Sequence, residues 1–173
     1  MPASYRPPIR ADKNKNRTAS QSKATNLKQD TGTVAQLIEG KSSGVIAIRP
    51  EDTISSAVGI LSEKRIGALI VTDAEGKLVG ILSERDIVRK LAATPGQTLP
   101  QSVSDNMTSK VVTCEKIDTL VDVLRRMTEG KFRHMPVVDG DEPIGMITIG
   151  DVVQYRLAEV EQEALQLKQM VVG

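Results

Sequence analysis

The chain has 173 residues, a formal net charge of +1 and an aromatic content of only 2%. This length suits one compact domain or two closely paired halves, and the near-neutral charge argues against strong non-specific binding to DNA or membranes. Few aromatic rings argue against stacking on single-stranded nucleic acid, and a single cysteine excludes an internal disulfide. No apolar run approaches transmembrane length and no signal-peptide core follows Met1, so we expect a soluble, cytoplasmic protein.

Residues 1–33 are predicted to form a disordered basic tail. Residues 1–30 hold seven Lys/Arg and two Asp, whereas the remaining chain holds 16 basic and 20 acidic residues, a balance of −4. The tail has no hydrophobic period and cannot bury enough apolar area to offset its conformational entropy. A mitochondrial-type targeting segment and a weak nucleic-acid or partner-binding arm stay open as alternatives for it.

Hydrophobic periodicity begins at Val34, and residues 34–93 are predicted to form one structural unit. A short helix over 34–38 is followed by Gly40, which stops it. We then expect a strand over residues 45–48 and a helix over 53–64, opened by Asp52 or Thr53. A strand over 68–72, a turn over 73–76 and an antiparallel strand over 77–82 follow, and a helix opened by Ser83 or Asp86 covers 83–92.

Residues 94–102 are predicted to be a linker, after which residues 103–158 repeat the same order. The segment Gly80–Asp86 (GILSERD) returns as Gly145–Asp151 (GMITIGD), and a repeat of this length indicates one supersecondary unit present twice with a shared buried face. Residues 103–107 correspond to the leading helix, and the expected strand, helix, two strands and last helix occupy 111–114, 118–129, 134–138, 143–148 and from 151 onward. Cys114, in the first of these strands, is expected to be a small core residue, with a reactive or intermolecular thiol as the alternative.

The last helix is predicted to extend beyond the second copy over residues 159–173. Its apolar residues recur at alternating spacings of four and three, which is typical of a coiled-coil seam: Val153, Leu157, Val160, Ala164, Leu167 and Val171. We expect this seam to form a homodimer contact. Packing of the seam on its own domain is the alternative.

Each copy ends with a strand, a turn and a helix start that carries a hydroxyl residue and, three positions later, an acid. These pairs are Ser83 with Asp86 and Thr148 with Asp151. A helix N-terminus attracts anions, and a carboxylate can accept both hydrogens of a vicinal diol, so phosphate plus ribose is the simplest ligand. The alternative is that the hydroxyls only cap the helices and the acids only favour the helix dipole.

The doubled motifs resemble those of the CBS domain family, specifically a stand-alone tandem CBS pair (a Bateman module), over about residues 34–158. The segments that carry the resemblance are 46–48, 66–71 and 80–86, with their counterparts 112–113, 132–138 and 145–151. It implies an α+β fold in which each copy folds as β-α-β-β-α and the two copies pack about a pseudo-two-fold axis. The extended C-terminal helix is added to this fold.

The resemblance also implies the roles of individual residues in two clefts for an adenosine-containing ligand. Asp86 and Asp151 would hold ribose hydroxyls, and Ser83 and Thr148 would meet the phosphate. The adenine would lie against residues donated by the opposite copy, which are Ile46, Ala47, Ile66 and Met146 in the Asp151 cleft and Val112, Thr113, Phe132 and Ile81 in the Asp86 cleft.

The two copies differ at positions that would face the phosphate. Arg133 and His134 stand where the first copy has Gly67 and Ala68, and the family pattern puts a basic pair there on the ligand phosphate. A hydrogen-bonded structural imidazole is the alternative for His134. Arg85 either supplies phosphate charge to the first cleft or is a solvated first-turn residue. We expect a compact ligand such as AMP at Asp151, and a longer one such as NAD(H) in the Asp86 cleft, which Gly67 and Ala68 leave roomier.

The function implied is that of a regulatory sensor, which binds AMP or a related adenine nucleotide such as ATP or NAD(H) and signals to an effector protein by a conformational change. The sequence shows no metal-ligand cluster, no nucleophile beside a base and no phosphate-binding loop motif, so we expect a non-enzyme. The alternatives are a dimeric scaffold with empty clefts, and a redox- or nucleic-acid-linked factor that uses Cys114 or the tail. Membrane and nucleic acid are not the expected partners.

Overall fold

A computed structural model describes residues 32–41 and 44–173, which fold into two α+β repeats. Most of the segment predicted as a disordered tail, with its alternatives of a targeting segment or a binding arm, lies outside the described residues.

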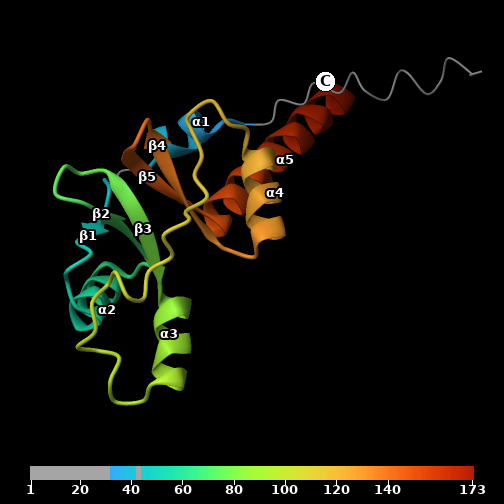
Figure 1. Cartoon of the computed structure of the whole chain (residues 1–173). Helices are drawn as coiled ribbons and strands as arrows, with labels where there is room; N and C mark the ends of the chain where they lie inside the picture. Colours follow the sequence, from blue (N-terminus) through green and yellow to red (C-terminus); the bar gives the residue numbers. More distant parts are fainter. Residues whose placement is uncertain (1–31, 42–43) are drawn as a thin grey trace, which may run out of the picture. The chain divides into compact units, whose positions relative to one another are not determined.

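The first repeat has the predicted order of elements (Figure 1). It consists of β1 (Ala47–Ile48), α2 (Ile54–Lys64), β2 (Ala68–Thr72), β3 (Leu78–Ser83) and α3 (Glu84–Ala93). The central strand β2 pairs parallel with β1 and antiparallel with β3, which gives a three-stranded sheet. All five residues of β2 are buried, as expected for a strand covered on both faces.

The second repeat contains α4 (Leu120–Gly130), β4 (His134–Asp139), β5 (Glu142–Thr148) and α5 (Ile149–Val172), with β4 and β5 antiparallel. The prediction of a strand over residues 111–114 was wrong, because only one isolated bridge forms there, between Cys114 and Val137. In the first repeat the N–H of Ile70 donates to the carbonyl of Ile46, at 3.3 Å. The corresponding residue of the second repeat is Pro136, which has no N–H to extend the ladder.

The two segments that precede the repeats in sequence are exchanged between them: each one packs into the core of the other repeat. Helix α1 (Val34–Glu39) lies just before the first repeat but packs into the core of the second, where Val34 is fully buried. The N–H of Val34 donates to the carbonyl of Asp118 at 2.9 Å, and the N–H of Leu120 donates to the carbonyl of Gly32 at 2.8 Å. The leading segment is therefore exchanged rather than folded back on its own repeat.

The segment before the second repeat makes the reciprocal contact. The N–H of Val103 donates to the carbonyl of Asp52 at 2.8 Å, and the N–H of Ile54 donates to the carbonyl of Gln101 at 2.9 Å. Val103 is also fully buried, in the core of the first repeat, and a single helical turn follows it instead of a helix like α1. Equivalent residues thus make equivalent contacts in both directions, as an internal pseudo-two-fold axis requires.

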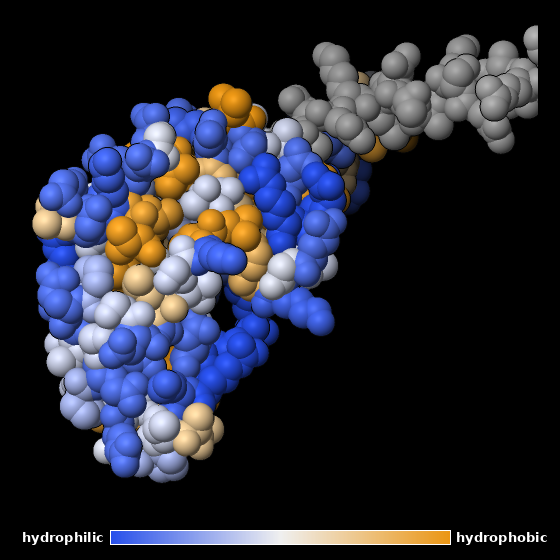
Figure 2. All heavy atoms as spheres, viewed as in Figure 1, coloured by the Kyte–Doolittle hydropathy of each residue, from blue (hydrophilic) through white to orange (hydrophobic). Residues whose placement is uncertain are grey.

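Two aliphatic cores result, one for each repeat, and the predicted α+β fold class is confirmed. The first repeat buries Ile48, Ile54, Ala57, Leu61, Leu69, Val71, Leu82, Ile87 and Val103. The second repeat buries Val34, Leu37, Cys114, Leu120, Val123, Met127, Met135, Val137, Ile147 and Val152. In the space-filling view apolar side chains gather on part of the face and hydrophilic ones cover most of the rest (Figure 2).

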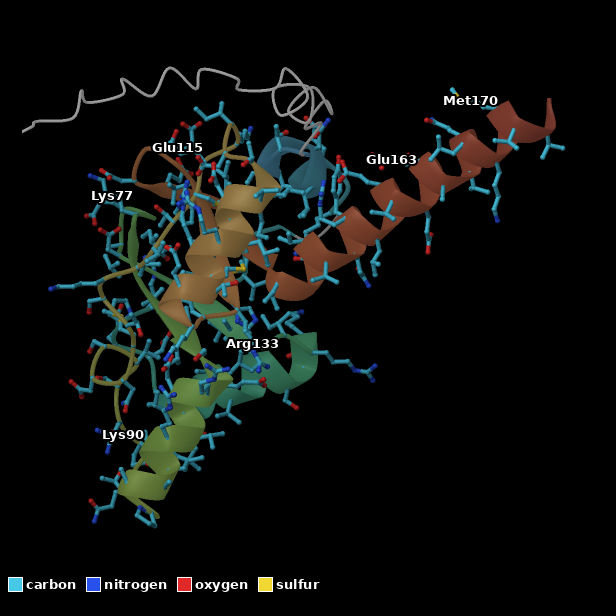
Figure 3. The ribbon with its side chains drawn as sticks, turned by 90° about the vertical axis from the view of Figure 1, so that its right-hand side faces the viewer. Lys77, Lys90, Glu115, Arg133, Glu163 and Met170 are labelled. Carbon is cyan, nitrogen blue, oxygen red and sulfur yellow. The ribbon has the colours of Figure 1, made fainter. Side chains whose placement is uncertain are left out.

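The extended C-terminal helix is confirmed, since α5 runs for 24 residues. Its first turns pack on α1 and α4, whereas Glu163 and Met170 lie on a stretch that projects beyond the other described elements (Figure 3). The seam residues Val153, Leu157, Val160, Leu167 and Val171 are 46%, 57%, 56%, 63% and 84% exposed. The alternative in which the seam packs on its own domain is therefore wrong.

Candidate functional site

Both hydroxyl–acid pairs close capping boxes at the starts of α3 and α5. The Ser83 N–H and Oγ donate to Oδ2 of Asp86, at 3.1 and 2.6 Å, and the Asp86 N–H donates to Ser83 Oγ at 3.2 Å. Likewise the Thr148 N–H donates to Oδ2 of Asp151 at 2.9 Å, and the Asp151 N–H donates to Thr148 Oγ1 at 3.1 Å.

The capping role that was considered as an alternative is therefore present at both helices. It occupies one oxygen of each carboxylate, and Oδ1 of Asp86 and of Asp151 accepts no hydrogen bond from any described residue. Capping and ligand binding are compatible, because the cap fixes the rotamer of the acid while the second oxygen stays available.

A pocket of about 430 Å³ opens beside Asp86, where the first repeat meets the second. Eight of the residues expected to bind nucleotide line it together: Ile81, Ser83, Arg85, Asp86, Val112, Phe132, Arg133 and His134. Thr113, which was expected in this cleft, does not line it. Arg133 lies between the end of α4 and the start of α3 (Figure 3).

The pocket has a surplus of positive charge. Its lining includes five cationic side chains and two carboxylates, namely Arg85, Arg89, Lys110, Lys131 and Arg133 against Glu84 and Asp86. The Arg85 guanidinium also donates to the carbonyl of Lys131 at 3.3 Å, so it reaches across from α3 to the end of α4. A surplus of this sign around a helix N-terminus favours an anionic ligand.

Three further cationic residues line the pocket that were not expected there, namely Arg89, Lys110 and Lys131. Arg89 carries a usable signal, because it lies three positions after Asp86 on the same helix and therefore on the same face. Lys110 and Lys131 lie in connections whose course is set by the packing of the repeats, so local sequence patterns do not place them in the pocket.

His134 occupies the space beside Gly67 of the opposite repeat. A side chain at Gly67 would approach Nε2 of His134 to 3.0 Å, so the imidazole takes up the space that Gly67 leaves, and the expectation of a roomier Asp86 cleft stays a prediction. Burial lowers the pKa of the His134 imidazole, and the carboxylates of Glu84 and Asp151 only partly oppose this shift. The imidazole lines the pocket and forms no hydrogen bond to any described residue. The described residues therefore do not support the alternative of a hydrogen-bonded structural histidine.

The carboxylate of Asp151 forms an ion pair with Lys41. The Lys41 ammonium lies 2.6 Å from Oδ2 of Asp151 and 3.0 Å from the carbonyl oxygen of Met146, and both side chains of the ion pair are less than one-third exposed. Burial raises the pKa of the Asp151 carboxyl, but the hydrogen bonds from Lys41 and Thr148 outweigh burial and hold that pKa below its usual value. Lys41 was not expected at this site, because it lies 110 residues away from Asp151 along the chain.

A second hollow of about 430 Å³ lies on this side of the molecule. It is lined by Ala35, Ile38, Glu39, Lys41, Gly44, Lys116, Ile144, Gly145 and Met146. Of the residues expected in the Asp151 cleft, Met146 lines this hollow, whereas Ile46, Ala47, Ile66, Thr148 and Asp151 line neither it nor the Asp86 pocket. The two sites therefore differ in the described state, one being open and the other occupied by a lysine.

Cys114 is a core residue, as predicted, and is 1% exposed. Burial raises the pKa of its thiol to about 12, with a further contribution from the Asp118 carboxylate. A thiol that stays protonated is a poor nucleophile, so the alternative of a reactive Cys114 has no support in its surroundings.

Two absences apply to the part of the chain that the structure describes. Residues 32–41 and 44–173 include no group of three or more His, Cys, Asp or Glu side chains placed to hold a metal ion. Among the described helices, none combines the length and the apolar character that crossing a membrane requires.

Comparison with known proteins identifies the family. The CBS domain model matches residues 36–93 and 102–158, so the chain belongs to the CBS domain family and carries two CBS domains. It is similar to the crystal structure of a CBS-domain containing protein from Agrobacterium tumefaciens, with 41% identity and a TM-score of 0.70 over 72% of this chain and 99% of that chain. The predicted tandem CBS pair is thereby confirmed.

Two further relatives bear on ligands and length. The crystal structure of CBSX2 in complex with AMP has 31% identity and a TM-score of 0.57, over 66% of this chain and 88% of that chain. The mitochondrial CBS domain-containing protein CBSX3 of Arabidopsis thaliana is 32% identical over 71% of this chain. The match covers 62% of the length of CBSX3, which is less than two thirds of that relative.

Proposed function

We propose that this tandem CBS protein is a regulatory sensor of adenosine nucleotides, and that the pocket beside Asp86 is its open binding site. The observation that carries the proposal is the convergence, in one pocket of about 430 Å³, of a carboxylate with a free oxygen, a helix N-terminus and five cationic side chains. Ribose hydroxyls would bind Asp86, the phosphate would lie among the cations, and Phe132, Val112 and Ile81 would flank the base. The AMP complex of the related CBSX2 supports the adenosine class.

The charge of the pocket bears on the length of the ligand. Five cations against two carboxylates exceed what one phosphate needs, which supports ligands with two or more phosphates, such as ADP, ATP or NAD(H), beside AMP. We propose these ligands for the Asp86 pocket and a compact nucleotide, AMP, for the Asp151 site.

The proposed output is a conformational signal rather than a reaction. A ligand shifts an equilibrium only by its differential affinity for two states, and a pocket between two repeats supplies such a difference when the repeats move. We propose that the protein is not an enzyme, that it acts on an effector protein, and that it works as a homodimer joined through the exposed seam of α5. The second candidate function is a dimeric scaffold with empty clefts. Calorimetric titration with adenosine compounds distinguishes it from the sensor.

Asp86→Asn tests the proposed site. A carboxylate that accepts two hydroxyls contributes charge-assisted hydrogen bonds of about 1.5–3 kcal/mol each, so nucleotide affinity at this pocket should fall at least about tenfold. Calorimetric titration of AMP, ADP, ATP, NAD(H), S-adenosylmethionine and adenosine into the wild type and the variant measures this loss.

Asp105→Asn is the matched control, because Asp105 is an exposed acid that does not line either hollow. Its affinities should equal those of the wild type. If no adenosine compound binds the wild-type protein, the sensor proposal fails and the scaffold function remains.

A further inference from the structure

We propose that Lys41 determines ligand specificity at the Asp151 site: it occupies Asp151 when the site is empty and transfers to the phosphate when a nucleotide binds. This inference rests on the proposed nucleotide-binding function and extends it to the second site.

The contact is built into the fold. The backbone of Lys41 is anchored next to Asp151, because the N–H of Lys41 donates to the carbonyl of Ile38 at 3.0 Å and α1 is held in the second core by Val34 and Leu37. The ammonium then bridges Oδ2 of Asp151 and the carbonyl oxygen of Met146. Since the backbone is fixed, binding of a ligand requires only the flexible side chain of Lys41 to move.

A ribose diol that uses both oxygens of the Asp151 carboxylate competes directly with Lys41, whose ammonium is on one of them. Oδ2 of Asp151 already accepts the Thr148 N–H and the Lys41 ammonium, so a diol that uses both carboxylate oxygens must displace the ammonium. Lys41 and Asp151 have side chains that are only 29% and 22% exposed. A half-buried ammonium that loses its counter-ion is unfavourable unless another anion replaces it.

The phosphate of a nucleotide is such an anion. Lys41 and Lys116 both line the hollow beside the ion pair, so a displaced Lys41 and a ligand phosphate can meet there with a second cation present. AMP replaces the carboxylate partner of Lys41 with its phosphate, whereas adenosine removes that partner and supplies none. The Asp151 site should therefore discriminate strongly in favour of the phosphorylated ligand.

The Asp86 site provides the internal contrast. No described lysine or arginine forms an ion pair with Asp86, although several line its pocket. A neutral adenosine can thus reach Asp86 without breaking an ion pair. Discrimination between AMP and adenosine should be greater at Asp151 than at Asp86.

The test is calorimetric titration of AMP and of adenosine into Lys41→Met in an Asp86→Asn background, which leaves one site. Loss of the ammonium should weaken AMP at least about tenfold and strengthen adenosine, so the two affinities converge. Lys41→Arg retains a cation and should preserve preference for AMP. Lys64→Met is the control, because Lys64 is an exposed lysine on α2 and should change neither affinity.

Four outcomes decide the matter. Opposite shifts of the two affinities support the inference, whereas equal weakening or no change overturns it. If AMP binds the wild type but not the Asp86→Asn protein, the inference fails and the proposed function stands; if no adenosine compound binds any form, both fail. Circular dichroism checks folding, and Lys41→Gln provides a second neutral variant should Lys41→Met unfold.

Discussion

Asp86 and Asp151 occupy equivalent positions in the two repeats, yet their carboxylates have different neighbours. Both accept the capping bonds of their own helix, but only Asp151 carries an ion-paired lysine. The difference lies in the lysines of the leading segments: Lys41 pairs with Asp151, whereas Lys110, at the corresponding place before the second repeat, lines the Asp86 pocket but forms no ion pair with Asp86. Two motifs that cap their helices in the same way can therefore have different ligand preferences.

His134 gives a prediction about pH. Burial lowers the pKa of its imidazole in the folded protein, so between that value and about 6.5 the unfolded chain binds more protons than the folded one. The free energy of unfolding should therefore decrease as the pH falls through about 6.5, by at most about 1.4 kcal/mol per pH unit. Urea unfolding at pH 7.5 and pH 5.5 measures this change.

Because His134 is the only histidine in the chain, the control is direct. His134→Gln should remove this dependence and leave the acid-side loss that comes from carboxylates. An unchanged slope in the variant would contradict the shift that burial imposes on this imidazole.

At the scale of elements, α5 has the properties of a parallel coiled-coil strand. Its exposed seam spans about 27 Å at 1.5 Å per residue, from Val153 to Val171. If two copies of α5 paired in parallel with Leu157 and Leu167 as core positions, Arg156, which is ion-paired with Glu159 in the single chain, would face Glu161 of the partner subunit, and Glu163 would face Lys168 of the partner subunit. Both pairs have opposite charge, which supports parallel association of two copies.

Leu167→Glu tests the seam. A charge at the dimer core should shift the protein to a monomer in multi-angle light scattering, because the buried carboxylate would have no partner. Leu165→Glu is the matched control on the same helix, since Leu165 is 58% exposed but lies off the seam. Equal effects of the two substitutions, or none, would exclude this interface.

For the whole molecule, the exchange of leading segments couples the two repeats. Val34 stabilises the second repeat although it precedes the first, and Val103 stabilises the first although it precedes the second. A ligand bound in the Asp86 pocket would contact both repeats, and if it bound only the folded state it would add about 2.7 kcal/mol of stability at 100 times its Kd. Ligand binding would then be linked to the folding of both halves.

Val34→Ala and Val103→Ala test this exchange as a crossed pair. Each removes buried methyl groups and should cost about 1–3 kcal/mol. In native-state hydrogen exchange, Val34→Ala should increase exchange mainly in β4 and β5, and Val103→Ala mainly in β2 and β3. The reverse pattern, with each substitution weakening the repeat that follows it in sequence, would contradict the exchanged packing.

Much of the fold could be predicted because its signals are local. Helix starts are marked by N-cap residues whose side chains accept a hydrogen bond from the backbone three residues later, namely Thr53, Ser83, Thr119 and Thr148. The strands are indicated by short apolar runs. The missing strand before α4 had no local signal of its own. Its cause is Pro136, which stands where Ile70 donates a ladder bond in the first repeat, and this could be used only once the pairing of the two segments was known.

The sequence by itself determined the capped acids and the amphipathic period of the last helix, because each depends on residues within a few positions of one another. It also determined the doubled unit, because two copies of one segment can be matched directly. Tertiary structure alone decided which residues share a site. It placed His134 beside Gly67 and Lys41 on Asp151, 110 residues away along the chain, because the leading segments cross between repeats. Such contacts depend on how two surfaces pack, which no local pattern encodes.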